Sequence, residues 1–270
     1  MPTTTLTAHL DHVIVMLDPD AYRDVLASAL LPGFSRFSVK ESESSLAGRY
    51  SCATVVGHST MVELFDVTAP PLPDVTGGLV LSFEEPGSSA AARDALTAAG
   101  VPFTYELVER QVEGESGMRP WYHLIRPELG PDNPFLLMVA EVTTEYYAHI
   151  GAVSEDGSLS RAGYLDAQLG GAPPPDLPMG DVTAIALRLR ADLADRLART
   201  LTALGWEQTA ADELVGPGVS IRLARGEPSG VTRVRVSASE VDSATESYGG
   251  SSVLDVRGGE ADWHFTPAGA

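Results

Sequence analysis

A strand–helix–glycine–strand pattern recurs along the chain and limits the folds that it can adopt. An apolar extended run leads into an amphipathic helix, and a glycine ends the helix before the next extended segment, at residues 12–39, 78–107 and 182–214. The second and third copies share nearly identical helix ends, LTAAGVPF and LTALGWEQ. This repetition indicates structural modules rather than one irregular fold.

Further strand-like segments follow each helix. They cover residues 50–56 and 59–67 after the first helix, and residues 119–127 and 134–142 after the second. With one helix in each module, the chain has too few helices for a doubly wound sheet. The sequence therefore predicts an α+β fold of repeated βαβββ modules, in which antiparallel-rich mixed sheets curve into a cup with helices on the outer face.

Composition divides the chain into three parts. Residues 1–150 hold two modules, which we expect to pair and form the candidate active-site cup. Residues 151–180 are rich in Gly, Pro and Ser, as is typical of a connector. Residues 181–270 hold a third module and three short strand-like segments that predict an incomplete fourth. We expect this last part to brace the first or to complete a homodimer.

Charge and cysteine content narrow the classes of partner. The 37 acidic and 18 basic residues give a net charge of −19, dispersed along the chain, which disfavours nucleic acid and anionic membranes as partners. A neutral or cationic small molecule is the expected ligand, although acidity could also serve solubility alone. The single cysteine excludes an internal disulfide, and no secretion signal or membrane-length apolar run is visible, so we expect a cytoplasmic protein.

Several short segments resemble the glyoxalase-like, or vicinal oxygen chelate (VOC), superfamily. They are LDHVIVMLDPDAY, MVELFD, GGLVLSFE, PWYH and PFLLMVAE. Within that superfamily the chain is most similar to glyoxalase-like domain proteins without an established function. The resemblance implies paired βαβββ modules that form a cup. In metal-using members, each module supplies a His from its first strand and a Glu from its last.

By this resemblance, His12 and Glu63 correspond to the first metal-binding pair. The second module lacks the His, and Met138 stands where the second Glu is expected, with Glu141 three residues further on. A catalytic metal needs three protein ligands and an open position, so Glu141 or His123 would have to be the third. The resemblance thus allows one divalent metal, Fe, Mn, Zn or Ni, held by His12, Glu63 and Glu141.

Strand alternation places further side chains with this pair. It puts Met61, Glu63 and Phe65 on one face of their strand, and Trp121 and His123 on one face of another. A carboxylate among apolar neighbours needs a partner or takes up a proton, so Glu63 is a candidate ligand or general base. The candidate catalytic residues are Glu63, His12 and His123. The candidate substrate-binding residues are Trp121, Tyr122, Met61, Phe65, Met138 and Tyr50.

Two classes of function remain open from the sequence. The first is a VOC-type enzyme that polarises a substrate oxygen or abstracts a proton, with isomerase, cyclase or lyase chemistry and with or without a metal. An extradiol-type dioxygenase fits less well, because it requires a complete His, His, Glu set. The second class is a binding or sequestering protein that uses the same cup without chemistry, as drug-resistance members of the superfamily do. No P-loop, dinucleotide-binding, GxSxG, HExxH or paired CxxC motif occurs.

Overall fold

The computed structural model describes residues 6–70, 72, 74–112, 114, 116–154 and 157–267. The first part of the chain forms, in order, β1 (His9–Leu17), α1 (Pro19–Leu26), α2 (Leu31–Phe34), β2 (Arg36–Ser44), β3 (Gly48–Val56), β4 (Met61–Asp66), β5 (Gly77–Ser82), α3 (Ser88–Ala98), β6 (Phe103–Gln111), β7 (Met118–Pro127), β8 (Phe135–Val142) and α4 (Thr144–His149). The second part forms α5 (Arg161–Leu169), β9 (Met179–Leu189), α6 (Ala191–Ala203), β10 (Glu207–Ala210), β11 (Glu213–Gly216), β12 (Val219–Arg225), β13 (Gly230–Tyr248) and β14 (Ser252–Phe265).

Strands β1 to β8 close into a barrel in the order β1-β4-β3-β2-β6-β7-β8-β5. In each βαβββ module the first strand pairs in parallel with the last, β1 with β4 and β5 with β8, and the two modules join through antiparallel pairing of β1 with β5. The predicted α+β fold of repeated modules is therefore confirmed. At the opposite junction β2 and β6 share one register pair, Ser44 with Arg110, so the barrel is weakly closed there.

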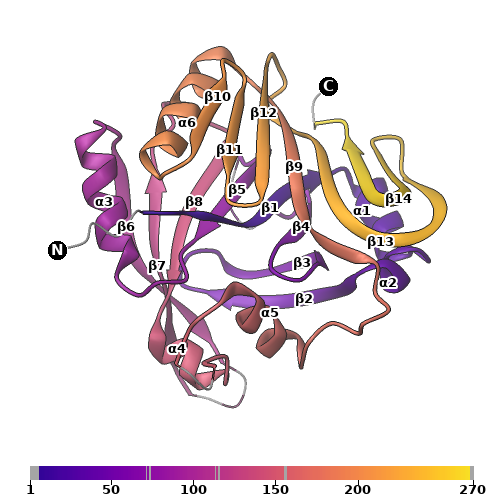
Figure 1. The fold of residues 1–270 in the computed structure, drawn as a ribbon, viewed down its shortest axis with the longest axis horizontal. Helices are drawn as coiled ribbons and strands as arrows, with labels where there is room; N and C mark the ends of the chain where they lie inside the picture. The colour runs from indigo at the N-terminus through magenta and orange to yellow at the C-terminus, as the bar shows by residue number, and fades with distance from the viewer. Residues whose placement is uncertain are drawn as a thin grey trace.

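The last third of the chain forms a six-stranded sheet in the order β10-β11-β12-β9-β13-β14, drawn in orange and yellow in Figure 1. Strands β9 to β12 and helix α6 repeat the βαβββ pattern, with β12 parallel to β9. Beyond them, the prediction of three short strands was wrong, because the structure has one long hairpin of two strands. Its register shifts between Ser237 and Ala244, opposite Gly258, so bulges bend the ladder where the sequence suggested strand ends.

Alternation along β1 separates two hydrophobic clusters. Val13, Val15 and Leu17 point out of the barrel into a large core that also contains Ile185 and Leu187 of the C-terminal sheet and the buried faces of α1, α3 and α6. Ile14 and Met16 point into the barrel, where a smaller cluster includes Phe65 and Met138. The C-terminal sheet is thus packed on the outside of the barrel, and the barrel interior is left for the candidate site.

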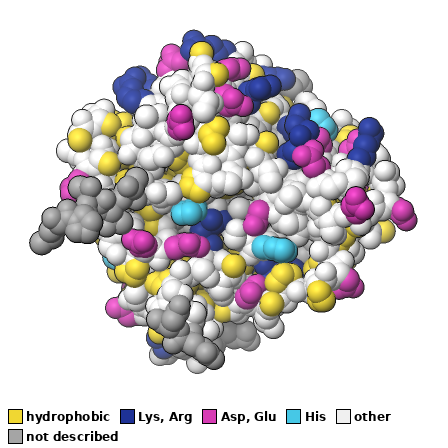
Figure 2. Space-filling view, in the orientation of Figure 1, with side chains coloured by type: hydrophobic (Ala, Val, Ile, Leu, Met, Phe, Trp, Pro, Cys, Tyr) yellow, Lys and Arg dark blue, Asp and Glu magenta, His cyan; other side chains and the backbone are white. Residues whose placement is uncertain are grey.

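The surface and the helices bear on two further expectations. Acidic side chains are spread over the face shown in Figure 2 rather than gathered in one patch. None of the helices in the described part of the chain is long and apolar enough to cross a membrane. The segment expected to be a connector contains α5 and the start of β9, and the division of the chain at residues 150 and 180 stays a prediction.

Candidate functional site

The barrel encloses a mainly apolar cavity of about 140 Å³. Asp11, His12 and Glu63 line it and supply its charged groups, while aromatic and aliphatic side chains make up most of the remaining wall. All six residues predicted to bind substrate lie on this wall. They are Trp121, Tyr122, Met61, Phe65, Met138 and Tyr50. Their role in binding stays a prediction, but the structure brings them to one place.

A bulge in β1 turns two consecutive side chains toward this cavity. Opposite β5, the register shifts between Leu10 and His12, so that Asp11 is an extra residue in the strand. A bulge interrupts the usual alternation, and here Asp11 and His12 both line the cavity. The prediction placed His12 correctly but did not include Asp11, although a carboxylate in an apolar strand was visible in the sequence.

His12 lies between two carboxylates. Its Nδ1 atom is 2.7 Å from Asp11 Oδ1, and its Nε2 atom is 3.3 Å from Glu63 Oε2. The His12 and Glu63 side chains are only 14% and 13% exposed, so this ion pair is largely withdrawn from water. The two strands that carry them, β1 and β4, are parallel neighbours, which is why residues far apart in the sequence meet here.

The contacts set the protonation states of the three groups. Burial alone would lower the pKa of His12, but its contacts with Asp11 and Glu63 outweigh burial and raise the pKa to about 9. Burial would raise the pKa of Glu63 and Asp11, yet the neighbouring imidazolium holds the pKa of each carboxyl below its usual value. At neutral pH the site therefore holds a cationic His12 between two carboxylates.

Cys52 donates its thiol hydrogen to Glu63 Oε1 over 3.1 Å. The residue is buried, and it contacts the candidate base. Burial and the nearby Glu63 charge raise the pKa of the thiol, so Cys52 stays protonated and acts as a hydrogen-bond donor. Both carboxylate oxygens of Glu63 are thus held in place.

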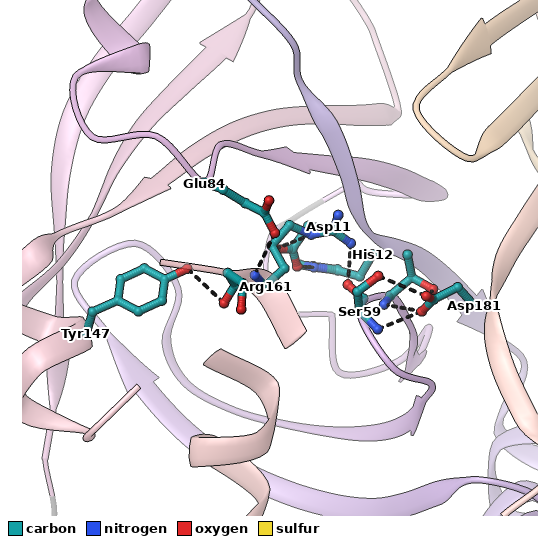
Figure 3. A network of polar contacts seen from close by, with 9 residues as sticks. Asp11, His12, Ser59, Glu84, Tyr147, Arg161 and Asp181 are labelled. Atoms are coloured by element: carbon teal, nitrogen blue, oxygen red, sulfur yellow. Dashed lines mark hydrogen bonds and ion pairs between the residues drawn. The ribbon is translucent and has the colours of Figure 1, made fainter. Parts of the chain in front are cut away.

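Arg161 extends the chain of charges from outside the barrel wall. It begins α5, and its Nε atom lies 3.9 Å from Asp11 Oδ2. Its backbone N–H donates to Glu84 Oε1 over 2.9 Å, and its guanidinium also donates to the Ser59 carbonyl, so Figure 3 shows it between Glu84 and Asp11. No sequence pattern points to Arg161, because it stands in a stretch rich in Gly, Pro and Ser.

The structure does not place His123 in the cavity. The register between β6 and β7 shifts at Val108 and Glu109, which leaves Trp121 as an extra residue in β7. Trp121 and Tyr122 both line the cavity as a result, and His123 points outward, where its Nδ1 atom lies 2.8 Å from the Tyr105 hydroxyl. The prediction that Trp121 and His123 share a face was wrong because of this bulge.

Glu141 also lies outside the candidate site. Its two carboxylate oxygens accept the backbone N–H groups of Gly87 and Ser89, each over 2.6 Å. These groups belong to the start of α3, where unpaired N–H donors and the helix dipole favour an anion. Glu141 is therefore a buried helix cap, and its predicted role as a metal ligand is not supported by this geometry.

The donor set in the cavity does not fit a divalent metal. Val80 pairs with Met138 in the second module, as Ile14 pairs with Glu63 in the first. The Met138 thioether therefore stands where the second carboxylate is expected. The glycine two residues before Val80 stands where the second histidine is expected. Within the described ranges, no group of three or more His, Cys, Asp or Glu side chains could hold a metal ion. The available carboxylate of Glu63 is instead paired with a cationic imidazole.

Paired βαβββ modules around an inner cavity are the arrangement of the glyoxalase-like fold. The chain belongs to a family of unknown function (DUF5829), whose family model matches residues 10–265. No curated protein matches the sequence.

Three solved structures align with most of the chain. A catechol 2,3-dioxygenase is 12% identical, with a TM-score of 0.49 and coverage of 98% of this chain and 90% of that one. A Mn(II)-bound glyoxalase from Novosphingobium aromaticivorans is 11% identical, with a TM-score of 0.47 and coverage of 94% and 80%. The 2,2',3-trihydroxybiphenyl 1,2-dioxygenase from Sphingomonas wittichii strain RW1 is 11% identical, with a TM-score of 0.47 and coverage of 97% and 91%. No statement about the chemistry of this chain follows from them.

Proposed function

We propose that this protein is an enzyme that moves a proton on a small organic molecule bound in the barrel, with Glu63 as the general base. The observation that supports the proposal most is an ionised carboxylate that lines an apolar cavity and is held there by His12 and Cys52. The lowered pKa of Glu63 keeps its carboxylate ionised at neutral pH, so that it is ready to accept a proton from a bound substrate. Isomerisation, epimerisation or elimination would follow from the same first step.

The substrate class follows from the proton that Glu63 can take. A carbon-bound hydrogen is acidic enough for a carboxylate only beside an electron-withdrawing group, and a carbonyl is the group that we assign to the substrate. Glu63 takes the proton, the C–H electron pair forms a C=C bond, and the carbonyl π electrons move to oxygen, giving an enolate. The protonated Glu63 then returns the proton to the same or to a conjugated carbon. His12 keeps Glu63 ionised and oriented before the transfer.

The charges around the cavity favour a neutral substrate. Glu63 and Asp11 carry negative charge, and His12 and Arg161 carry positive charge, so the four groups balance. A substrate with a full charge would find no unpaired counterion among these four groups. The acidic surface of the protein would still admit a cation more readily than an anion, in line with the expected neutral or cationic ligand.

A non-catalytic binding protein is the second candidate, and one observation favours it. Both oxygens of Glu63 already have partners, His12 and Cys52, as expected of a carboxylate with a structural role. The aromatic wall would then serve binding alone. The two candidates differ in one property, because only the enzyme exchanges carbon-bound hydrogen of its ligand with solvent.

Hydrogen exchange in D2O tests the proposal. Proton NMR would follow deuterium incorporation next to the carbonyl of cyclohexanone, acetophenone and 1-phenylpropan-2-one. We expect the protein to accelerate exchange of at least one of them, and Glu63→Gln to remove the acceleration. Quenching of Trp121 fluorescence reports binding in parallel, since Trp206 and Trp263 are buried in the outer core. Ligand binding without exchange in the native protein would contradict the enzyme and support the binding protein.

A further inference from the structure

Two tyrosines that line the cavity carry hydroxyls with no hydrogen-bond partner among the described residues. Tyr50 and Tyr122 both line the cavity, and within the described part of the chain neither hydroxyl makes a hydrogen bond. The third tyrosine on this wall differs, because the Tyr164 hydroxyl accepts the Trp121 indole N–H over 2.8 Å. A phenol in a mainly apolar cavity satisfies its donor when it can. The two free hydroxyls therefore offer two hydrogen bonds to a ligand.

The two rings approach the cavity from different parts of the barrel wall. Tyr50 lies on β3, and its ring packs on Phe65 with centroids 6.1 Å apart. Tyr122 lies on β7 just after the bulge at Trp121, and these two rings meet edge to face at 4.6 Å. Because packed rings have few alternative rotamers, each hydroxyl has a defined direction. Preorganised donors of this kind stabilise charge that develops on a ligand.

Both hydroxyls stay protonated at neutral pH. Burial and then the negative charge of Glu63 raise the pKa of Tyr50 above its ordinary value, and the same two causes raise the pKa of Tyr122. A neutral phenol can donate a hydrogen bond, whereas a phenolate cannot. That Glu63 affects both hydroxyls also places all three groups in one electrostatic environment.

We propose that Tyr50 and Tyr122 form an oxyanion-binding pair that holds the carbonyl oxygen of an enolisable ketone while Glu63 takes the proton from the adjacent carbon. This inference rests on the proposed function and deepens it. The two O–H donors would polarise the substrate carbonyl in place of a metal ion. A metal ion would lack its second carboxylate ligand here, because Met138 stands in that position. As the enolate forms, negative charge moves from Glu63 to the substrate oxygen, and the two O–H donors stabilise it there.

The pair also sets the substrate class. A ketone or aldehyde accepts two hydrogen bonds at one oxygen, so it satisfies both donors. An ether of the same size is a weaker acceptor, and a hydrocarbon leaves both phenols unpaired. The cavity should therefore select for a carbonyl group on an otherwise apolar molecule.

An enolate analogue tests the pair without turnover. The host is Glu63→Gln, which imitates the protonated base present when the enolate exists. The probe is 4-nitrophenol, whose ionised form absorbs visible light, and 4-nitroanisole is the matched neutral ligand without an oxyanion. We expect the host to bind 4-nitrophenolate at least about tenfold more tightly than 4-nitroanisole, because hydrogen bonds to a charged acceptor are stronger than those to a neutral one.

Three variants in the host separate the donors from the ring packing. Tyr50→Phe and Tyr122→Phe should each weaken 4-nitrophenolate binding about tenfold or more, by the value of one donor to an anion, and leave 4-nitroanisole binding unchanged. Tyr105→Phe removes a hydroxyl outside the cavity, beside His123, and should change neither. Phenolate binding that is unaffected by both cavity variants would overturn the inference.

The same variants in the native background distinguish failure of the pair from failure of the proposed function. If hydrogen exchange depends on Glu63 but on neither tyrosine, the oxyanion-binding pair is wrong and the proposed function stands. Phenolate binding that depends on both tyrosines, in a protein without hydrogen exchange, would support the oxyanion site and overturn the enzyme. With both proposals correct, each Phe variant should slow exchange by roughly 10²-fold or more, as loss of one oxyanion donor does elsewhere.

Discussion

His12 Nε2 lies 3.3 Å from Glu63 Oε2 inside the barrel, although the two residues stand on the first and last strands of their module. Parallel pairing of β1 with β4 brings His12 opposite Met61 and places Glu63 two residues further along the same inner face. The pair therefore depends on the module fold, and its chemistry depends on the bulge that adds Asp11 beside His12.

The first prediction concerns stability and pH. The pKa of His12 is raised from 6.5 to about 9, so its stabilising effect is complete below about pH 6.5 and is lost as the pH rises through about 9. The pKa values of Asp11 and Glu63 are lowered. Their contribution to the free energy of unfolding is therefore present above their ordinary pKa values and is lost as the pH falls through the lowered values. The free energies of unfolding in urea of the native protein and of His12→Gln should differ more at about pH 6 than at about pH 10. An equal difference at both pH values would contradict the charged His12.

The second prediction concerns metal. Because Met138 and a glycine replace the second ligand pair, we expect protein purified without chelator to hold no stoichiometric divalent metal, and EDTA to leave hydrogen exchange unchanged. Elemental analysis of the native protein, His12→Ala and Glu63→Ala provides the measurement. One equivalent of metal in the native protein, lost in both variants, would show that a chelate forms despite this donor set.

The third prediction concerns Asp181, which fastens the C-terminal sheet to the barrel. Its carboxylate accepts the backbone N–H of Ser59 and Thr60 over 2.6 and 2.8 Å and both of their hydroxyls. Figure 3 shows Ser59 beside Asp181. Removing an acceptor of several hydrogen bonds should lower the free energy of unfolding by about 2–3 kcal/mol in Asp181→Ala. Asp176→Ala, at an exposed aspartate, is the matched control and should leave urea unfolding unchanged. Equal effects would refute the role of Asp181.

The fold was predictable from the sequence because its signals are local and repeated. Apolar alternation, amphipathic helices and the glycines after the helices each determine a few residues, and the module follows from their order. Met61, Glu63 and Phe65 share the inner face as alternation predicts, because β4 contains no bulge in its pairing with β1 or β3.

The rest of the site depends on departures from regular geometry. The bulges at Asp11 and Trp121 change which side chains face the cavity, and their positions are set by pairing with β5 and β6, which no local pattern encodes. Glu141 resembled a metal ligand in the sequence because it lies on the last strand of the second module, three residues after Met138. In the structure its carboxylate instead binds the N-terminus of α3. Arg161 comes from a segment whose composition indicates only a connector.

The most direct test of the account compares two glutamates in chelator-treated protein. Glu63→Gln should abolish deuterium incorporation into a ketone that the native protein exchanges, while ligand quenching of Trp121 fluorescence persists. Glu141→Gln should retain exchange, because Glu141 only caps α3, although it should lower the free energy of unfolding by about 1 kcal/mol. Undiminished exchange in Glu63→Gln, or equal loss in both variants, would contradict the assignment of Glu63 as the base.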